Sequence, residues 1–151
     1  PLLRDQGSGH IVQVSSMGSA GGFAATGLYS AGKAALDAMA EALTMEVERF
    51  GIKVTILQPG GYRTDLFTRG LTTTDENPAY APLRTWLNGL WAESEDSDPH
   101  LAAAVLTQVV DLPEPPKRLV LGGSAYDMVT QMAQARTDEL AKWEQLSRQA
   151  G

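Results

Sequence analysis

The sequence predicts an α/β fold, a doubly wound parallel sheet of three strands with flanking helices. Two short runs rich in β-branched residues, 10–14 and 52–57, stand on either side of a long helical pattern. A third such run, 118–121, follows a second helical pattern. Strands that are joined by a crossover helix pair in parallel, so this order predicts a parallel sheet.

The first strand lies close to the start of the chain. Residues 1–6 have the pattern of the last turn of a helix, and the following Gly-Ser-Gly ends it. The strand 10–14 then runs into Ser15 and Ser16. A loop of small residues occupies 17–27.

The long helix is expected from about 29 to 50. Alanine, leucine and methionine give it a wide apolar face, and Gly51 ends it. The strand 52–57 comes next and is followed by Pro59-Gly60-Gly61. Strand, helix and strand together form a βαβ unit.

The second half of the chain contains less regular structure. Residues 64–97 are expected to be irregular, and Asp98 followed by Pro99 is typical of the start of a helix. That helix extends to about Asp111, before the strand 118–121. A polar helix beginning at Ser124 or Asp127 then reaches about Ser147.

Composition excludes several classes of function. The formal net charge of −6 and the absence of a basic run disfavour nucleic-acid or anionic-membrane binding. No cysteine is present, which excludes disulfides and thiolate metal sites, and the scattered His10 and His100 do not indicate a metal site. No apolar stretch is long enough to span a membrane, and the N-terminus is unlike a signal peptide. We expect a soluble cytoplasmic protein with one domain, 1–151.

Tyr29 and Lys33 lie four residues apart at the start of the long helix and therefore share one face. An ammonium group beside a phenol favours the phenolate, which allows a tyrosine to act as a general acid or base. A tyrosine and a lysine at this spacing also recur by chance. The pair alone therefore does not establish a catalytic role.

Ser16 stands at the carboxyl end of the first strand, thirteen residues before Tyr29. Parallel α/β sheets bind ligands at this edge, where a hydroxyl can donate to a substrate oxygen. We interpret the neighbouring Ser15, Ser19 and Ser30 as ordinary loop serines.

The segment from Pro59 to Thr64 occupies the carboxyl end of the second strand. A plain turn explains its Pro-Gly dipeptide, but glycines there also let a flat ring approach the backbone closely.

Taken together, these segments resemble the signature of the short-chain dehydrogenase/reductase family. The resemblance rests on the strand ending in Ser-Ser, the Tyr-x-x-x-Lys helix and the Pro-Gly-x-x-x-Thr loop, in family order and spacing. It extends over essentially the whole chain. It implies a partial Rossmann-like fold and an NAD(P)-dependent oxidoreductase of alcohols and ketones.

The resemblance also implies roles for single residues. Tyr29 would exchange a proton with the substrate oxygen, Lys33 would hold the nicotinamide ribose hydroxyls, and Ser16 would orient the substrate carbonyl or hydroxyl. Thr64 and the backbone around Tyr62 would hold the nicotinamide carboxamide. The implied catalytic residues are Ser16, Tyr29 and Lys33, and the implied cofactor-binding residues are Tyr29, Lys33, Pro59, Gly60, Gly61, Tyr62 and Thr64.

The chain departs from the family pattern in several places. Ser19 stands where the family usually has glycine, and Gly32 where serine is common. The family's glycine-rich phosphate loop, its Asn-Ala-Gly motif and its catalytic asparagine belong upstream of Pro1. We therefore expect the chain to represent the catalytic C-terminal half of the fold, without the nucleotide-binding half. The preference for NAD or NADP cannot be read, because the residue that meets the ribose 2′ position lies on a strand outside this sequence.

The segment of about 65–97 corresponds to the family's variable substrate loop. Its aromatic residues Phe67, Trp86 and Trp91 fit either an apolar small-molecule substrate or a lid, or they simply pin the loop to the core. A homo-oligomer is also expected, because the long helix has more apolar surface than one sheet contact needs, at Leu36, Met39, Ala40, Leu43 and Val47.

Two other interpretations of the chain remain. It could be a catalytically inactive fragment or binding module of the same fold, which a cofactor titration distinguishes from an enzyme. It could also be a structural α/β domain whose motifs coincide by chance.

Overall fold

The structure is a computed structural model that describes residues 1–70, 72, 74–92 and 96–151. Its sheet has three strands, β1 (Gly9–Val14), β2 (Ile52–Pro59) and β3 (Arg118–Leu121), in the spatial order β1-β2-β3. Both pairings are parallel, with Gly9 opposite Ile52 and Ile56 opposite Arg118. The predicted fold class and the three predicted strands are confirmed.

The central strand β2 is covered on both faces. Val54 and Ile56 point to one face and Thr55 and Leu57 to the other, and all four are almost completely buried. Burial on both faces is expected for the central strand of a parallel sheet that has helices on both sides.

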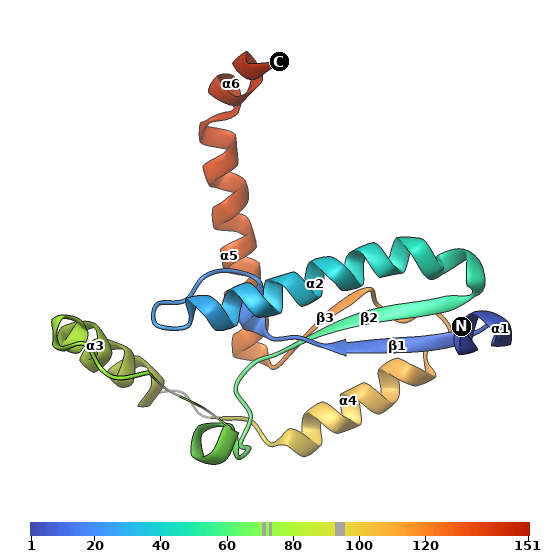
Figure 1. Ribbon diagram of the computed structural model, residues 1–151, viewed down its shortest axis with the longest axis horizontal. Coiled ribbons are helices and arrows are strands. Elements are labelled where there is room, and N and C mark those ends of the chain that lie inside the picture. The colour runs from blue at the N-terminus through green and yellow to red at the C-terminus, as the bar shows by residue number, and fades with distance from the viewer. Residues whose placement is uncertain (71, 73, 93–95) are drawn as a thin grey trace.

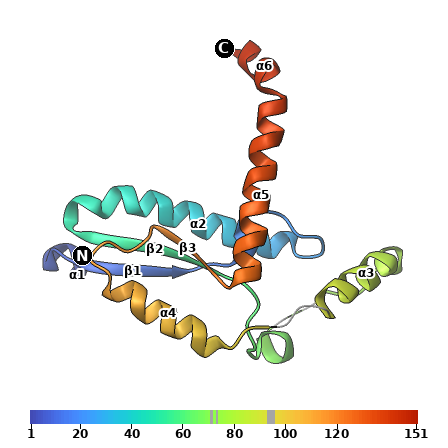
Figure 2. The same ribbon diagram turned by 180° about the vertical axis from the view of Figure 1, so that it is seen from behind.

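The helices form layers on the two faces of the sheet. Helix α2 (Gly27–Val47) lies on one face and α4 (Pro99–Asp111) on the other (Figure 1), as the view from behind also shows (Figure 2). On the α2 side, Ala40 packs with Val54 and Ile56 in the buried core. Ile11, Leu43 and Val47 are partly buried against this cluster.

The helix ends follow local chemistry. The Asp98 side chain accepts a hydrogen bond from the backbone N–H of His100 at 2.9 Å, and Pro99 occupies the first turn of α4. After α2, a short 3-10 turn, Glu48–Phe50, leads into Gly51, which has φ 68°. A Cβ at Gly51 would lie 2.5 Å from the carbonyl oxygen of Gly7, so both the backbone angle and the close contact require glycine here.

The two ends of the chain are helical. Helix α1 (Leu2–Gln6) is the predicted terminal turn, and Gly7 ends it with φ 70°. Helix α5 (Gly123–Lys142) begins at the sheet and extends away from it, followed by α6 (Glu144–Ser147) and a final 3-10 turn, Arg148–Ala150 (Figure 1). The Arg136 guanidinium donates to the Ala20 carbonyl at 2.8 Å, which ties α5 to the loop after β1.

The expectation of irregular structure throughout 64–97 was wrong. Helix α3 (Ala81–Ala92) lies in this segment, preceded by a π-helical turn, Leu66–Gly70, and a 3-10 turn, Pro78–Tyr80. Pro82 is tolerated because it stands in the first turn of α3, and Leu83 and Leu87 lie one turn apart on its less exposed side. Residues 93–95 of this segment lie outside the described residues.

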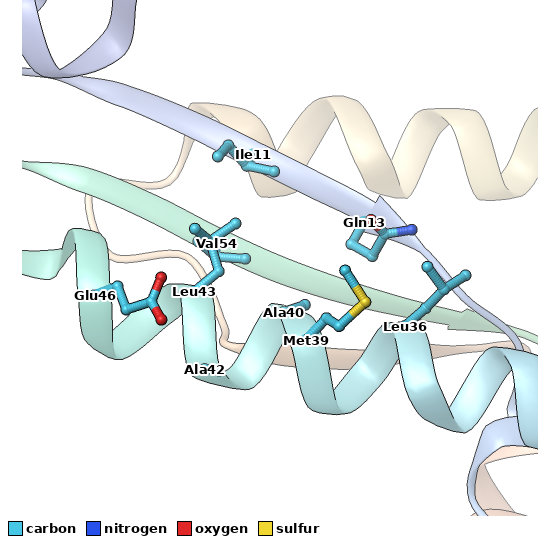
Figure 3. A pocket seen from close by; sticks show the side chains of 9 residues that line it. All are labelled: Ile11, Gln13, Leu36, Met39, Ala40, Ala42, Leu43, Glu46 and Val54. Carbon is cyan, nitrogen blue, oxygen red and sulfur yellow. The ribbon is translucent and has the colours of Figure 1, made fainter. Parts of the chain in front are cut away.

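An apolar hollow lies between α2 and β1. Figure 3 shows side chains of both elements facing it, with Met39 and Leu36 on the helix and Ile11 on the strand. Within the described residues β1 pairs only with β2, so the hollow borders the unpaired edge of the sheet. No described helix is long and apolar enough to cross a membrane.

Candidate active site

Two of the predicted site segments meet at one edge of the sheet. Ser16 follows β1, and the loop from Gly60 to Thr64 follows β2, so both lie at the carboxyl ends of neighbouring parallel strands. The Ser15 N–H extends the ladder by donating to the Leu57 carbonyl at 2.8 Å. Figure 1 shows the start of α2 and, farther from the sheet, α3 on this same side of the molecule.

Ser16 begins a tight turn and is buried. It is the N-cap of the 3-10 turn Met17–Ser19, and its hydroxyl oxygen accepts a hydrogen bond from the Gly18 N–H at 3.1 Å. That bond occupies a lone pair and leaves the hydroxyl hydrogen available to another acceptor.

Tyr29 lies next to the Ser16 turn. A Cβ at Gly18 would lie 3.3 Å from the Tyr29 ring and 3.4 Å from the Ser16 hydroxyl oxygen. The serine hydroxyl and the tyrosine ring therefore both border the open side of Gly18. The Tyr29 side chain is half exposed, and its hydroxyl makes no hydrogen bond within the described part of the chain.

Lys33 follows one turn later on α2. Its ammonium nitrogen lies 5.9 Å from the centre of the Tyr29 ring, and it donates a long hydrogen bond of 3.4 Å to the Val14 carbonyl. The Ser15 hydroxyl donates to the Lys33 carbonyl at 3.3 Å, which joins α2 to the end of β1. The structure thus brings Ser16, Tyr29 and Lys33 together.

The glycines of the second loop permit close packing within this chain. A Cβ at Gly60 would lie 2.8 Å from the Ala125 side chain, in the first turn of α5. A Cβ at Gly61 would collide with the Asp96 carboxylate. Contacts within the chain therefore account for both glycines, whether or not a ring of a ligand also approaches them.

Backbone pairing closes the base of the predicted substrate loop. Tyr62 and Ser97 form an isolated parallel bridge in which the Arg63 N–H donates to the Ser97 carbonyl and the Ser97 N–H to the Gly61 carbonyl, both at 3.0 Å. Burial raises the pKa of the Tyr62 phenol. Thr64 is exposed, and its hydroxyl accepts a long bond of 3.4 Å from the Leu66 N–H.

A buried polar cluster lies beneath the Ser16 turn. One carboxylate oxygen of Asp37 accepts hydrogen bonds from the Ser19 hydroxyl at 2.7 Å, the Gln58 amide at 2.8 Å and the Arg118 guanidinium at 2.6 Å. Arg118 also donates to Glu41 at 2.6 Å. We call Asp37, Ser19, Gln58 and Arg118 the Asp37 cluster.

The Asp37 carboxylate is ionised despite its burial. Burial raises the pKa of Asp37, but the hydroxyls of Ser15 and Ser19 and the Arg118 guanidinium outweigh it, so the pKa lies below its usual value. Desolvation lowers the pKa of Arg118, yet its hydrogen bonds with Asp37 and Glu41 raise it overall.

Sequence reasoning missed this cluster. Ser19 was interpreted as an ordinary loop serine, whereas its hydroxyl bonds to a buried carboxylate, and Ser15 and Ser30 are also buried. One signal was available, because Asp37 stands four residues after Lys33 and three before Ala40, on the buried stripe of α2. A carboxylate at such a position requires partners.

The aromatic residues of the loop are partly described. Trp86 and Trp91 lie on α3, and both are more than half exposed. The side chain of Phe67 lies outside the described residues. Trp86 and Trp91 are therefore not buried core residues.

Known proteins share both the sequence and the fold of this chain. A family model described as short chain dehydrogenase matches residues 1–74, the part that contains every predicted site residue. An oxidoreductase named BOA17 from Botryotinia fuckeliana is 36% identical over 150 residues, which are 97% of this chain and 55% of that protein. A 3-ketodihydrosphingosine reductase from Bacteroides thetaiotaomicron is 34% identical over 127 residues, or 81% of this chain and 47% of the relative.

Solved structures agree. The crystal structure of a short-chain dehydrogenase from Streptomyces avermitilis has a TM-score of 0.86 and 42% identity, covering 100% of this chain and 56% of that one. A short chain dehydrogenase from Burkholderia cenocepacia, solved in complex with NADP, shares the fold with a TM-score of 0.64 at 19% identity, over 94% of this chain and 49% of that one. The chain thus spans about half the length of the proteins it matches. These similarities support placing the chain with the short-chain dehydrogenase family.

Proposed function

We propose that this chain carries the catalytic residues of an NAD(P)-dependent oxidoreductase that interconverts an alcohol and a carbonyl compound. The single observation that carries the proposal is the convergence of the Ser16 hydroxyl, the Tyr29 ring and the Lys33 ammonium at the carboxyl edge of a parallel sheet. Similarity to a family of oxidoreductases supports it.

The donor set at this edge fits a nicotinamide cofactor. Lys33 has one long hydrogen bond, to Val14, so two of its three N–H donors remain for the ribose hydroxyls. Thr64 and the backbone around Tyr62 would hold the carboxamide, and the loop from Pro59 to Gly61 would border the ring. When bound, the cofactor supplies or accepts the hydride of the reaction.

Tyr29 would act as the general acid or base. Its half-exposed hydroxyl, free of partners in the described structure, can meet a substrate oxygen from solvent. In reduction it would donate a proton to the developing alkoxide, and in oxidation it would accept the alcohol proton. Lys33 lies one helical turn away, with its ammonium nitrogen 5.9 Å from the centre of the Tyr29 ring.

Ser16 would orient the substrate. One lone pair of its hydroxyl oxygen accepts from the Gly18 N–H, and the hydroxyl hydrogen can point to a carbonyl oxygen that Tyr29 would also reach. Two donors on one oxygen would hold the reacting carbon in a fixed position and stabilise negative charge on that oxygen.

Other features belong to the same proposal. The exposed Trp86 and Trp91 on α3 favour an apolar substrate over a charged one. A homo-oligomer and a cytoplasmic location remain predictions. Of the five α2 residues that suggested an oligomer, Ala40, Leu43 and Val47 pack on the chain's own sheet, which leaves Met39 and the partly buried Leu36. The inactive-fragment interpretation remains the alternative.

The test is Tyr29→Phe in the natural full-length protein. The variant keeps the ring but loses the ionisable hydroxyl, so turnover should fall by a factor on the order of hundreds or more while cofactor affinity changes little. Tyr126→Phe is the matched control, because Tyr126 is also an exposed tyrosine, on α5. Near wild-type turnover in Tyr29→Phe would end the catalytic assignment.

A further inference from the structure

The turn that presents Ser16 is short and held by few bonds of its own. Its backbone closes through the Ser19 N–H, which donates to the Ser16 carbonyl at 3.0 Å. The Gly18 N–H donates to the Ser16 hydroxyl oxygen at 3.1 Å. The Ala20 N–H adds a second backbone bond, to the Met17 carbonyl at 3.1 Å. A three-residue 3-10 turn with two backbone bonds is weak by itself, so the position of the Ser16 hydroxyl depends on what anchors the turn's far end.

Ser19 stands at the far end of this turn, and its hydroxyl has three hydrogen-bond partners. Its hydroxyl lies 2.7 Å from the Ser16 carbonyl and 2.7 Å from the Asp37 carboxylate, and it accepts a bond of 2.6 Å from the Gln58 amide. The hydroxyl has one hydrogen for two acceptors, so Ser16 and Asp37 share it. The Gln58 amide uses its two hydrogens on Ser19 and Asp37.

The anchor connects four separate elements. Asp37 comes from α2, Gln58 from β2, Arg118 from β3 and Ser19 from the turn after β1. Asp37 lies one helical turn beyond Lys33 and two beyond Tyr29, so it is rigidly related to both. Buried, ionised hydrogen-bond acceptors form stronger bonds than neutral ones, which makes this carboxylate an effective fixed point.

We propose that Asp37 is a positioning residue: through Ser19 it holds the Ser16 turn in register with the Tyr29 helix. Its catalytic consequence rests on the proposed function, whereas its structural consequence does not. Without the anchor the turn would open more often, and the Ser16 hydroxyl would lose its fixed distance from Tyr29.

The chain offers a matched control for this role. Asp37 and Glu41 are both carboxylates on α2, and both bind Arg118 at 2.6 Å, but only Asp37 contacts Ser19. Asp37→Asn and Glu41→Gln therefore each remove one negative charge beside Arg118. Only Asp37→Asn also changes the acceptor of the Ser19 hydroxyl. Ser19→Ala cuts that link while leaving the Asp37–Arg118 pair, and it serves if Asp37→Asn fails to fold.

The first measurement is amide hydrogen exchange in the full-length protein. Asp37→Asn and Ser19→Ala should reduce protection of the Gly18 and Ser19 amides by about tenfold or more relative to Ile56, a sheet amide bonded to the Lys117 carbonyl. Glu41→Gln should leave that ratio unchanged. Unchanged exchange at Gly18 and Ser19 in Asp37→Asn, or an equal loss in Glu41→Gln, would overturn the proposal.

The second measurement is a double-mutant cycle with Ser16→Ala. Alone, Asp37→Asn should lower kcat/KM for the carbonyl substrate by about tenfold to a hundredfold, with little change in cofactor affinity. In the Ser16→Ala background it should cost nothing further, because the group that it positions is gone. An equal loss in both backgrounds would show that Asp37 acts by general stability and would refute the positioning role. If Ser16→Ala and Tyr29→Phe both kept full activity, the proposed reaction would fail, and the exchange experiment would still decide whether the cluster holds the turn.

Discussion

Lys33 shows how one side chain can serve two neighbours from a single position. It lies 5.9 Å from the centre of the Tyr29 ring, and its other described contact is the long bond to the Val14 carbonyl. An ammonium group held by one long hydrogen bond retains donors for a ligand while it lies close to the Tyr29 ring. Both roles depend on the ammonium group and not on the methylene chain.

Lys33→Met is expected to weaken cofactor binding. The substitution keeps most of the chain length but removes the donors for the ribose hydroxyls, so the Kd for NADH or NADPH should rise about tenfold or more in the full-length protein. Calorimetric titration measures it. Lys117→Met, which removes an exposed charge after the α4 helix, should leave the Kd unchanged. The same Kd in Lys33→Met and wild type would mean that Lys33 is a surface charge.

Local spacing predicted some site residues and could not predict others. Tyr29 and Lys33 are found from a helical interval, and Ser16 from the end of a strand, because a βαβ unit fixes where such positions meet. The Asp37 cluster is different. Asp37 and Arg118 are 81 positions apart, and only the packing of α2 against the sheet reveals that they pair.

At the scale of elements, the observed limits of helices and strands agree with the local end signals in the sequence. The strand 118–121 and the helix 99–111 were predicted with their observed limits, because Asp98-Pro99 and the proline-rich segment 113–116 are strong local signals. Helix α3 was missed because Pro82 and Gly89 resemble helix breakers. Position decides their effect, since a proline in the first turn costs no hydrogen bond and one interior glycine costs only about 1 kcal/mol.

The connection from α2 to β2 depends on one glycine. Gly51→Ala should lower the free energy of unfolding by about 1–3 kcal/mol, because it strains the backbone at φ 68° and places a methyl group against the Gly7 carbonyl. Urea denaturation measures the change.

A glycine inside the preceding helix α2 provides the contrast. Gly32→Ala should raise the free energy of unfolding by about 0.5–1 kcal/mol, because Gly32 lies inside α2 and a Cβ there meets nothing within 4 Å. Equal effects of the two substitutions would show that the connection tolerates a side chain at Gly51.

At the scale of the whole molecule, the sheet is open on one side. Within the described structure β1 pairs only with β2, so one row of β1 backbone groups has no strand partner there. The hollow of Figure 3 exposes apolar side chains beside that edge. Exposed strand edges and apolar grooves favour association with further polypeptide. Which polypeptide covers this edge determines how much of a ligand site the chain can form by itself.

The last prediction is that these 151 residues alone bind neither NADH nor NADPH tightly. Dinucleotide affinity in doubly wound folds comes largely from the pyrophosphate, which sits on a glycine-rich turn and a helix N-terminus, and from the adenosine pocket beside it. The sequence contains no Gly-x-Gly-x-x-Gly segment, and the candidate contacts, Lys33, Thr64 and the backbone near Tyr62, all belong to the nicotinamide end.

Isothermal titration of the chain with each cofactor checks this, and the short chain dehydrogenase from Burkholderia cenocepacia, which was solved in complex with NADP, serves as the positive control. We expect no measurable heat at micromolar concentrations of the isolated chain, since a ribose contact and a carboxamide contact cannot offset the loss of translational freedom on binding. Hydrogen exchange at Gly18 and Ser19 in the same sample establishes that the Ser16 turn is formed, so that absence of binding is not absence of folding. Micromolar affinity for either cofactor would mean that the three contacts near Tyr29 carry far more of the binding energy than the pyrophosphate site does.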